Sequence, residues 1–390
     1  MTNLLNRIFG KNEKRAMGID IGSSAIKLVE LYSDSGHIHL ETYGSVALGP
    51  YADMEVGRAT SLTNEKIQDA LMKIMEESGC GTKEAAVTIP FNTSLVSVIR
   101  LPKISENRLE QIIPNEARKY IPATLEEVML GWSVMDAQPD IPVDNEEFEK
   151  KKTESKDDQK KEEVKKEPEE KKTKKAEEID VLLAAIHKDS IERYRKIAEG
   201  VSLNVSLFEI EVFSTLRAVS PIQGNAPVAV MDIGATSSKI YIIEGGIMRS
   251  SHTVNRGSQD ISLSIAKTMD ISGEEAEMVK RAIGAGGSYI HLQEAVQNVL
   301  NRLFSETLKF IESYERKGGH SLEKVIISGG GSTMKGIQKI AETELSRQVD
   351  TARPFDRVKS LPFMKETLAR VGPEYTSALG AALRVVGVEN

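Results

Sequence analysis

A short pattern of strand, glycine turn and strand occurs twice in this chain and constrains the fold more than any other feature. The first copy runs over residues 17–31, MGIDIGSSAIKLVEL, and the second over residues 227–243, PVAVMDIGATSSKIYII. In each copy an aspartate near the end of a hydrophobic strand precedes a glycine and small polar residues. One such hairpin often arises by chance, but two copies that each open a half of the chain indicate a duplicated fold with two lobes.

The residues of the first turn suit a phosphate group. Gly22 and the small side chains of Ser23 and Ser24 let backbone N–H groups come close to an anion. Asp20 ends the first strand, where its carboxylate could hold a hydrated Mg²⁺ ion. Lys27 enters the second strand at a distance that could reach a phosphate. These features predict a nucleotide bound between the two lobes.

Length and composition narrow the class of protein. With 390 residues, two or three domains are expected. The net charge of −7 argues against a general nucleic-acid binder. No apolar run approaches the ~20 residues that a membrane-spanning helix needs. The single cysteine, Cys80, cannot form an internal disulfide, which favours a reducing cytoplasm and a structurally neutral thiol.

The middle of the chain predicts an inserted subdomain. After a short strand at residues 85–90, the elements expected between residues 94 and 200 follow in the order strand, helix, strand, strand, helix. Residues 144–178 are almost all Lys, Glu and Asp and predict a disordered charged loop, either a solvated spacer or a tether for another protein. We place the first lobe at residues 16–84, the insertion at 85–203, the return and crossover at 204–225, and the second lobe at 226–390, with its last helix packing back between the lobes.

A third motif lies near the end of the chain. Residues 324–337, KVIISGGGSTMKGI, read as a buried strand, three glycines and the start of a helix. Glycines at this point would let a flat base lie against the backbone, and a helix N-terminus favours negative charge.

The three motifs, in this order, resemble those of the actin/Hsp70/sugar-kinase superfamily. Within it the chain resembles the PilM family, cytoplasmic actin-like proteins of type IV pilus assembly. Residues 27–31, NEARKYIP at 115–122, LLAA at 182–185 and FEIEVF at 208–213 carry this resemblance, which covers residues 17–387 apart from the charged loop. It implies an α/β fold: a duplicated actin-like, ribonuclease H-like ATPase fold of two lobes with an FtsA/PilM-type inserted α/β subdomain.

The resemblance also implies a set of site residues for ATP and Mg²⁺. Asp20 and Asp232 would orient the metal and its waters. The phosphates and the adenosine would be held by Gly22, Ser23, Ser24, Lys27, Gly234, Ala235, Thr236, Gly329, Gly330, Gly331 and Ser332.

Three further residues are open to two interpretations. Glu277 and Lys280 lie in a run similar to the adenine-contacting helix of Hsp70-like proteins, or they form an exposed helix face. Glu211 falls where the superfamily places a group that positions the attacking water, which makes it the catalytic candidate. Alternatively, it is a helix N-terminal glutamate favoured by the helix dipole.

For function, the resemblance implies an ATP-binding adaptor at the cytoplasmic face of the inner membrane, in the assembly platform of a type IV pilus. It would grip the N-terminal cytoplasmic tail of a PilN-like membrane protein and contact other platform proteins, without binding nucleic acid. ATP would serve as a structural ligand or a switch, with at most slow hydrolysis.

Two alternatives stay open. One is an active ATPase or sugar kinase, although Ala235 stands where actin-like members carry an acid and no sugar-recognition block is present. The other is an FtsA-like division filament protein, although the chain stops soon after its last helix, without the membrane-targeting helix expected of that group.

Overall fold

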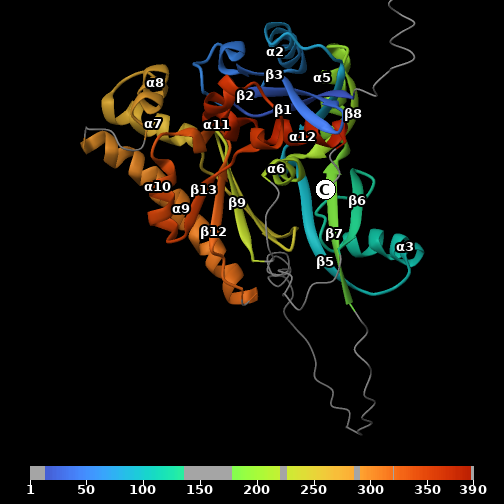
Figure 1. Cartoon of the computed structure of the whole chain (residues 1–390). Coiled ribbons are helices and arrows are strands. Elements are labelled where there is room, and N and C mark those ends of the chain that lie inside the picture. Colours follow the sequence, from blue (N-terminus) through green and yellow to red (C-terminus); the bar gives the residue numbers. More distant parts are fainter. Residues whose placement is uncertain (1–13, 136–177, 220–225, 285–289, 319, 388–390) are drawn as a thin grey trace, which may run out of the picture. The chain divides into compact units, whose positions relative to one another are not determined.

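The computed structural model describes residues 14–135, 178–219, 226–284, 290–318 and 320–387. By their contacts they form two compact units. Unit 1 comprises residues 1–94 and 186–390, and unit 2 comprises residues 95–185. Figure 1 follows the chain from blue at the N-terminus to red at the C-terminus. Among the described helices, none is both long enough and apolar enough to cross a bilayer.

The first lobe of unit 1 is built on a five-stranded sheet in the order β3-β2-β1-β4-β8. Helices α2 (Asn64–Glu77) and α5 (Lys188–Gly200) cover one face of this sheet and bury Met17, Ile19 and Leu28. Ile67 and Leu71 lie on the buried side of α2. The strands are β1 (Arg15–Ile21), β2 (Ala25–Asp34), β3 (His37–Ala47), β4 (Glu84–Ile89) and β8 (Asn204–Ile210).

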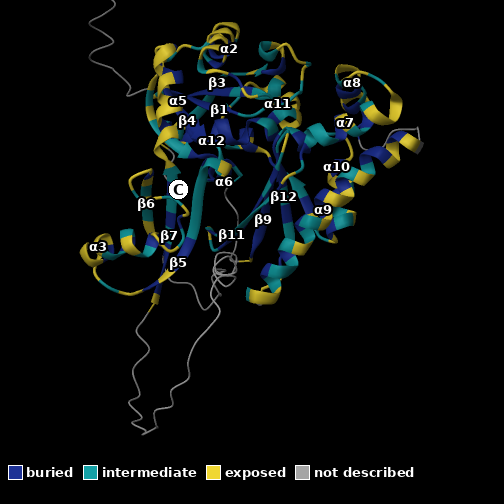
Figure 2. Cartoon of the chain, turned by 180° about the vertical axis from the view of Figure 1, so that it is seen from behind, coloured by how far each residue is buried: buried dark blue, intermediate teal, exposed yellow. Residues whose placement is uncertain are grey.

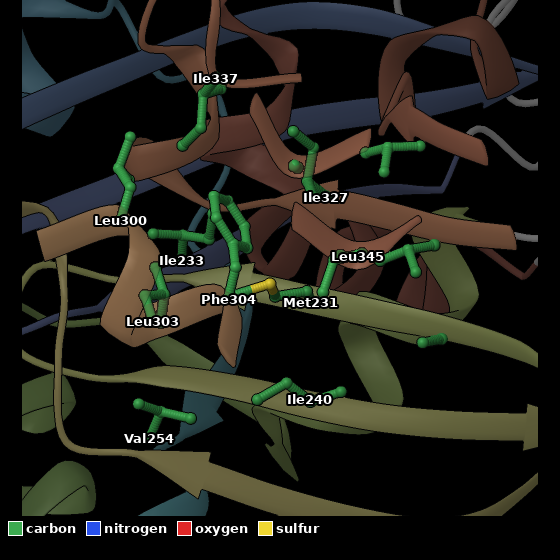
Figure 3. Packing of buried hydrophobic residues seen from close by; sticks show 14 of the residues in the cluster. Met231, Ile233, Ile240, Val254, Leu300, Leu303, Phe304, Ile327, Ile337 and Leu345 are labelled. Carbon is green, nitrogen blue, oxygen red and sulfur yellow. The ribbon is translucent and has the colours of Figure 1, made fainter. Parts of the chain in front are cut away.

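The second lobe repeats this plan with a five-stranded sheet in the order β11-β10-β9-β12-β13. Its core packs Phe304 of α9 against Met231 of β9, as Figure 3 shows. Figure 2 shows both sheets buried and the outer helix surfaces exposed. The elements are β9 (Val228–Ile233), β10 (Ser238–Glu244), β11 (Ile247–Val254), β12 (Lys324–Ser328), β13 (Gln348–Thr351), α7 (Ser258–Met269), α8 (Gly273–Ile283), α9 (Ile290–Gly318) and α10 (Ile337–Leu345).

The two sheets confirm the predicted duplication. In both, the first strand of the repeat pairs antiparallel with the next strand and parallel with a later one, β4 or β12. The register is also the same, since Asp20 lies opposite Lys27 in the first hairpin and Asp232 lies opposite Lys239 in the second. Each turn therefore holds its aspartate and its lysine on neighbouring strands, directly across from each other.

The end of the chain returns to the first lobe. Helix α12 (Thr376–Val386) packs on the sheet face opposite α2, beside α6 (Glu211–Val219). Gly18 of β1 allows this packing, because a Cβ at this position would overlap the carbonyl oxygen of Ala378. The N-terminus of α12 stays beside the second lobe, where Ser328 Oγ donates to Thr376 Oγ1 at 2.8 Å. Before it come α11 (Lys365–Val371) and the short helix η6 (Gly372–Tyr375).

The described part of unit 2 is a three-stranded sheet in the order β5-β7-β6 with helix α3 packed on it. Its core includes Ile99, Leu109, Ile113 and Val181. The elements are β5 (Ser94–Pro102), α3 (Glu106–Ala117), β6 (Val128–Met135) and β7 (Glu178–His187).

This unit is smaller than the insertion that the sequence predicts over residues 85–203. The difference arises because β4 and β8 pair with each other in the sheet of the first lobe, where α5 also packs. Of the charged loop predicted over residues 144–178, only Glu178 lies among the described residues, as the first residue of β7.

Cys80 is partly buried in unit 1, as a structurally neutral thiol would be. Burial raises the pKa of this thiol to about 12, and the nearby Glu30 carboxylate adds to the shift. A thiol with such a pKa is a poor nucleophile at neutral pH.

Candidate functional site

The first glycine turn joins β1 to β2. It is closed by Gly22, whose N–H donates to the carbonyl of Ala25 at 3.0 Å. Two neighbouring segments fix its other carbonyls, because Thr60 N–H donates to Ser23 O and Leu48 N–H donates to Ser24 O, both at 2.9 Å. The turn is therefore held by backbone bonds that use its carbonyl groups.

The second turn joins β9 to β10 in the same way. Gly234 N–H donates to the carbonyl of Ser237 at 3.0 Å, the counterpart of the Gly22 bond. The first residues of α7 hold this turn, since Ser258 and Gln259 donate their N–H groups to Gly234 O and Ala235 O. The sequence repeat thus corresponds to a repeat in backbone geometry.

The two turns face each other across one small cavity. Ser23 Oγ lies 3.5 Å from Thr236 Oγ1, although the two residues are 213 positions apart in the chain. The cavity has a volume of about 90 Å³. The turns supply much of its wall, and the N-termini of α6 and α12 contribute Glu211, Thr376 and Ser377. Helix N-termini present unpaired N–H groups, which favour a bound anion.

Four acidic residues line this cavity, Asp20, Glu211, Asp232 and Glu374, and close contacts hold the first three. Asp20 accepts a hydrogen bond from the buried Thr88 hydroxyl at 2.7 Å. Glu211 Oε1 accepts the N–H of Phe91 at 2.6 Å and lies 2.9 Å from Lys239 Nζ. Asp232 lies 3.6 Å from the same ammonium. Burial raises the pKa of Glu211, and the Lys239 charge opposes that shift.

Lys239 is a site residue that our sequence reasoning missed. Burial disfavours its charge, but the carboxylates of Glu211, Asp232 and Asp20 outweigh burial and raise the pKa of Lys239. The repeat itself holds the signal that could have found it, because Lys239 stands seven positions after Asp232 just as Lys27 stands after Asp20. Thr88 and Glu374, which also contribute to the site, give no comparable signal in the sequence.

The glycine motif after β12 forms a further wall of the site. Gly329 has a φ of +82° and donates its N–H to Pro373 O at 2.9 Å. Gly329 and Gly330 line the small cavity, and Gly331 lines a larger cavity next to it. Ser332 lines neither of them. Its buried hydroxyl instead donates to Gly329 O at 2.7 Å and stabilises the turn.

The larger cavity has a volume of about 680 Å³ and continues from the small one. Five residues line both cavities: Ser24, Ala25, Lys27, Gly330 and Glu374. Clefts of some 300–1,000 Å³ are usual for small-molecule ligands. The two cavities together form a cleft with a narrow polar end at the turns and a wide end beyond them.

Glu277 and Lys280 line the wide end and are bound to each other. Lys280 Nζ lies 2.5 Å from Glu277 Oε2, and Ser262 Oγ also donates to that oxygen at 2.6 Å. Burial disfavours the carboxylate, but Lys280, Ser262 and Arg281 together lower the pKa of Glu277. Burial also lowers the pKa of Lys280, against the effect of Glu277. Both side chains are mostly buried, which rules out the interpretation as an exposed helix face.

A segment of the first lobe reaches across to the second lobe beside the wide end. Ala59 N–H donates to Gln259 Oε1 at 2.5 Å, and Gly273 N–H donates to Glu55 Oε1 at 3.1 Å. Gly57 lies against the Glu277 side chain. These contacts join the two lobes where the cleft is widest.

A divalent metal fits the narrow end only in combination with other ligands. The described residues hold no cluster of three or more His, Cys, Asp or Glu side chains arranged to bind a metal ion. Mg²⁺ is usually bound by one or two carboxylates together with waters and substrate phosphates. Asp20 and Asp232, which face the same cavity, match that donor set.

Comparison with known proteins bears on the fold and the family. The chain matches the sequence profile described as type IV pilus assembly protein PilM over residues 18–156 and 167–386. A solved PilM–PilN type IV pilus biogenesis complex contains a chain that is 22% identical, with a TM-score of 0.74, over 95% of this chain and 98% of that one. The ethanolamine utilization protein EutJ from Carboxydothermus hydrogenoformans is 15% identical, with a TM-score of 0.52, over 95% of this chain and 89% of that one.

Two curated relatives are cell division proteins named FtsA. The protein from Bacillus subtilis (strain 168) is 25% identical over 158 residues, which cover 35% of this chain and 36% of that protein. The protein from Rhizobium meliloti (strain 1021) is 23% identical over 177 residues, 39% of each chain. The chain thus spans well under half the length of these relatives. The matches confirm the α/β actin-like ATPase fold expected from the sequence.

Proposed function

Since the chain belongs to the PilM family of type IV pilus assembly proteins, we propose that it is an ATP-binding adaptor of the pilus assembly platform. In this proposal Mg²⁺-ATP lies in the cleft between the lobes and stabilises their closed arrangement. The protein then binds the N-terminal cytoplasmic tail of a PilN-like membrane protein, which keeps it at the cytoplasmic face of the inner membrane, near other platform proteins.

The main support for the proposal is that the two glycine turns line the same cavity. Residues of both turns line one small polar cavity, and the hydroxyls of Ser23 and Thr236 lie 3.5 Å apart there. A chain of phosphates has the size and charge for such a place, because it needs many hydrogen-bond donors and little room. Lys27, which lines both cavities and has no ion pair or hydrogen bond among the described residues, would bind the phosphates directly.

The charge of the small cavity supports a metal-bound nucleotide. Its lining holds the carboxylates of Asp20, Glu211, Asp232 and Glu374 but only the two ammonium groups of Lys27 and Lys239. A free triphosphate would add further negative charge to a surplus of carboxylates. Mg²⁺ bound to the phosphates and oriented by Asp20 and Asp232 supplies the compensating charge when it is present.

The wide end of the cleft suits the nucleoside. It adjoins the phosphate end at Gly330, and its wall contains Gly331, Met334 and the bound pair Glu277 and Lys280. The glycines offer a flat backbone surface to a base, and the polar pair offers hydrogen-bonding groups to the nucleoside. The cross-lobe contacts of Glu55 and Gln259 lie beside this end, so a bound nucleoside would help to hold the lobes together.

Glu211 is the group that would act on a water molecule beside the phosphates. Both of its hydrogen-bonding contacts use Oε1, with Phe91 N–H and Lys239 Nζ as donors. This leaves Oε2 to accept a hydrogen bond from water. The Lys239 ammonium opposes the rise in pKa that burial gives Glu211 and so limits the strength of this base, and we propose slow hydrolysis, as suits an adaptor.

Nucleotide binding is tested by calorimetric titration of the full chain with Mg²⁺-ATP. We expect the wild-type protein to bind, and Lys27→Ala to weaken binding at least about tenfold because a direct phosphate contact is lost. Lys66→Ala, on the exposed side of α2, serves as a matched control and should bind as the wild type does. Absence of binding by the wild type, or equal binding by Lys27→Ala, would contradict the proposal.

The partner is tested with a synthetic peptide of the N-terminal cytoplasmic tail of the PilN-like protein from the same organism. We expect the full chain to bind this peptide but not a scrambled version, and to bind it more tightly with Mg²⁺-ATP present. The coupling between two ligands of one protein is typically 5–150-fold, which fluorescence anisotropy resolves. Failure to bind the peptide with or without ATP would refute the adaptor role and leave nucleotide binding intact.

A further inference from the structure

We propose that Lys239 is a built-in counter-ion at the phosphate end of the cleft. Its ammonium group holds the carboxylates of Glu211 and Asp232 in place. It also supplies part of the positive charge that a bound triphosphate otherwise takes from Mg²⁺. This inference rests on the ATP binding proposed above. It concerns the metal dependence of that binding and assigns a positioning role to a residue outside the glycine turns.

The first argument is the broken symmetry between two equivalent lysines. Lys27 and Lys239 occupy the same register position, each directly across the hairpin from an aspartate, and both line the small cavity. Lys27 has no ion pair or hydrogen bond among the described residues and extends along the wall of the wide end as well. Lys239 lies 2.9 Å from Glu211 and 3.6 Å from Asp232. The two lysines therefore differ in role: Lys239 pairs with carboxylates of the protein, and Lys27 does not among the described residues.

The second argument is burial. The side chain of Lys239 is 14% exposed, and those of Glu211 and Asp232 are 9% and 15% exposed. Charges removed from water to this degree interact more strongly than surface charges do, and a buried charge left without a partner is costly. The two flanking carboxylates favour the charged form of Lys239.

The third argument is the packing of the aromatic residues next to Lys239 and Glu211. Tyr241 follows Lys239 by two residues on β10, is fully buried, and has a hydroxyl without a hydrogen-bond partner in the described part of the chain. Its ring meets the ring of Phe91 edge to face with centroids 5.5 Å apart, and the Phe91 N–H binds Glu211. The Glu211 carboxylate is thus held through Oε1 by both the Phe91 N–H group and Lys239, and the Phe91 ring is itself packed against Tyr241.

These observations predict how chelation of Mg²⁺ changes ATP affinity. With Lys239 present, part of the charge on Glu211 and Asp232 is already neutralised, so a free triphosphate meets less repulsion. Without its charge, the carboxylates of Asp20, Asp232 and Glu211 face the phosphate end with Lys27 as the remaining lysine of the lining, and the metal must offset more of the negative charge. The metal dependence of binding, and not binding alone, is the property that Lys239 controls.

The experiment measures the dissociation constant of ATP by calorimetry in Mg²⁺ buffer and in EDTA. We expect the wild type to lose about tenfold in affinity on chelation and Lys239→Met to lose roughly 100-fold or more, since one buried charge close to the phosphates is removed. Lys27→Met is the matched control, with the same substitution at the equivalent position. It should weaken binding in both buffers and keep the tenfold ratio of the wild type. Lys239→Arg keeps the charge and should also keep that ratio.

Several outcomes decide the matter. Equal ratios for the wild type and a folded Lys239→Met variant would overturn the inference while ATP binding stands. If Lys239→Met does not fold, as circular dichroism would show, Lys239→Gln takes its place. If neither folds, the wild type decides, because a loss of more than about 100-fold on chelation would mean that Lys239 carries none of the needed charge. Absence of ATP binding by the wild type in Mg²⁺ would instead overturn the proposed function, and this inference with it.

Discussion

Gly380→Leu is expected to destabilise the native state strongly. Gly380 lies in α12, where a Cβ would overlap the carbonyl oxygen and carbon of Ser214 in α6. Both contacts are backbone atoms, so no side chain can turn away to make room. Overpacking of a core typically costs 1–3 kcal/mol, and backbone overlap of this kind should exceed it, at about 4 kcal/mol or more. We expect the unfolding midpoint in calorimetry to fall by about 5 °C, because the entropy of unfolding of a 390-residue chain is large.

The same position also anchors a buried ion pair, which adds to the expected loss. Arg217 donates to Gly380 O at 2.9 Å and forms two bonds of 2.7 Å with the Glu209 carboxylate. Pushing α12 away from α6 would remove the Gly380 carbonyl from the mostly buried guanidinium of Arg217, which would lose that acceptor. Gly131→Leu is the control, because Gly131 is exposed on β6 and a Cβ there meets nothing closer than 3.9 Å. A midpoint for Gly380→Leu within 2 °C of the Gly131→Leu value would refute this account of the packing.

The sequence predicted the parts of this molecule that depend on local pattern. The Asp-x-Gly hairpins at Asp20 and Asp232 indicated the duplication, and the structure brings their turns within reach of one cavity. The wall formed by Gly329, Gly330 and Gly331 followed from the triple glycine. Turn chemistry is local, because a few small residues in sequence determine how closely a backbone can approach a ligand.

The parts that the sequence did not predict depend on contacts between distant residues. Thr88 looks like an ordinary strand residue, and only the pairing of β4 with β1 brings its hydroxyl to Asp20. Gly380 must be a glycine because α6, more than 160 positions earlier in the chain, packs against it. Ser332 was expected beside the adenosine, but the tight turn at Gly329 directs its hydroxyl inward. The insertion boundary near residue 95 likewise depends on which sheet β4 and β8 join.

A paired substitution at the glycine wall separates its structural role from its contact with a ligand. Gly329 has φ and ψ of +82° and 169°, a region that only glycine occupies readily. A Cβ there would overlap Asp232 Oδ1 and lie 2.6 Å from Ile233 O, so Gly329→Ala must displace the aspartate that is proposed to orient Mg²⁺. We expect it to lower stability by about 3 kcal/mol and ATP affinity by 100-fold or more.

Gly330→Ala, one residue away, should give a different result. A Cβ at Gly330 has open space around it, with Glu374 Cγ as its nearest neighbour at 3.9 Å, so stability should change by less than about 1 kcal/mol. The added methyl group would nevertheless occupy the junction of the two cavities, where the proposed nucleotide lies against the backbone. We therefore expect weaker ATP binding with an unchanged unfolding midpoint, measured by calorimetry on both variants. If Gly329→Ala bound Mg²⁺-ATP as tightly as the wild type, Asp232 could not have the role proposed for it. If Gly330→Ala did so, the nucleotide could not lie against this wall.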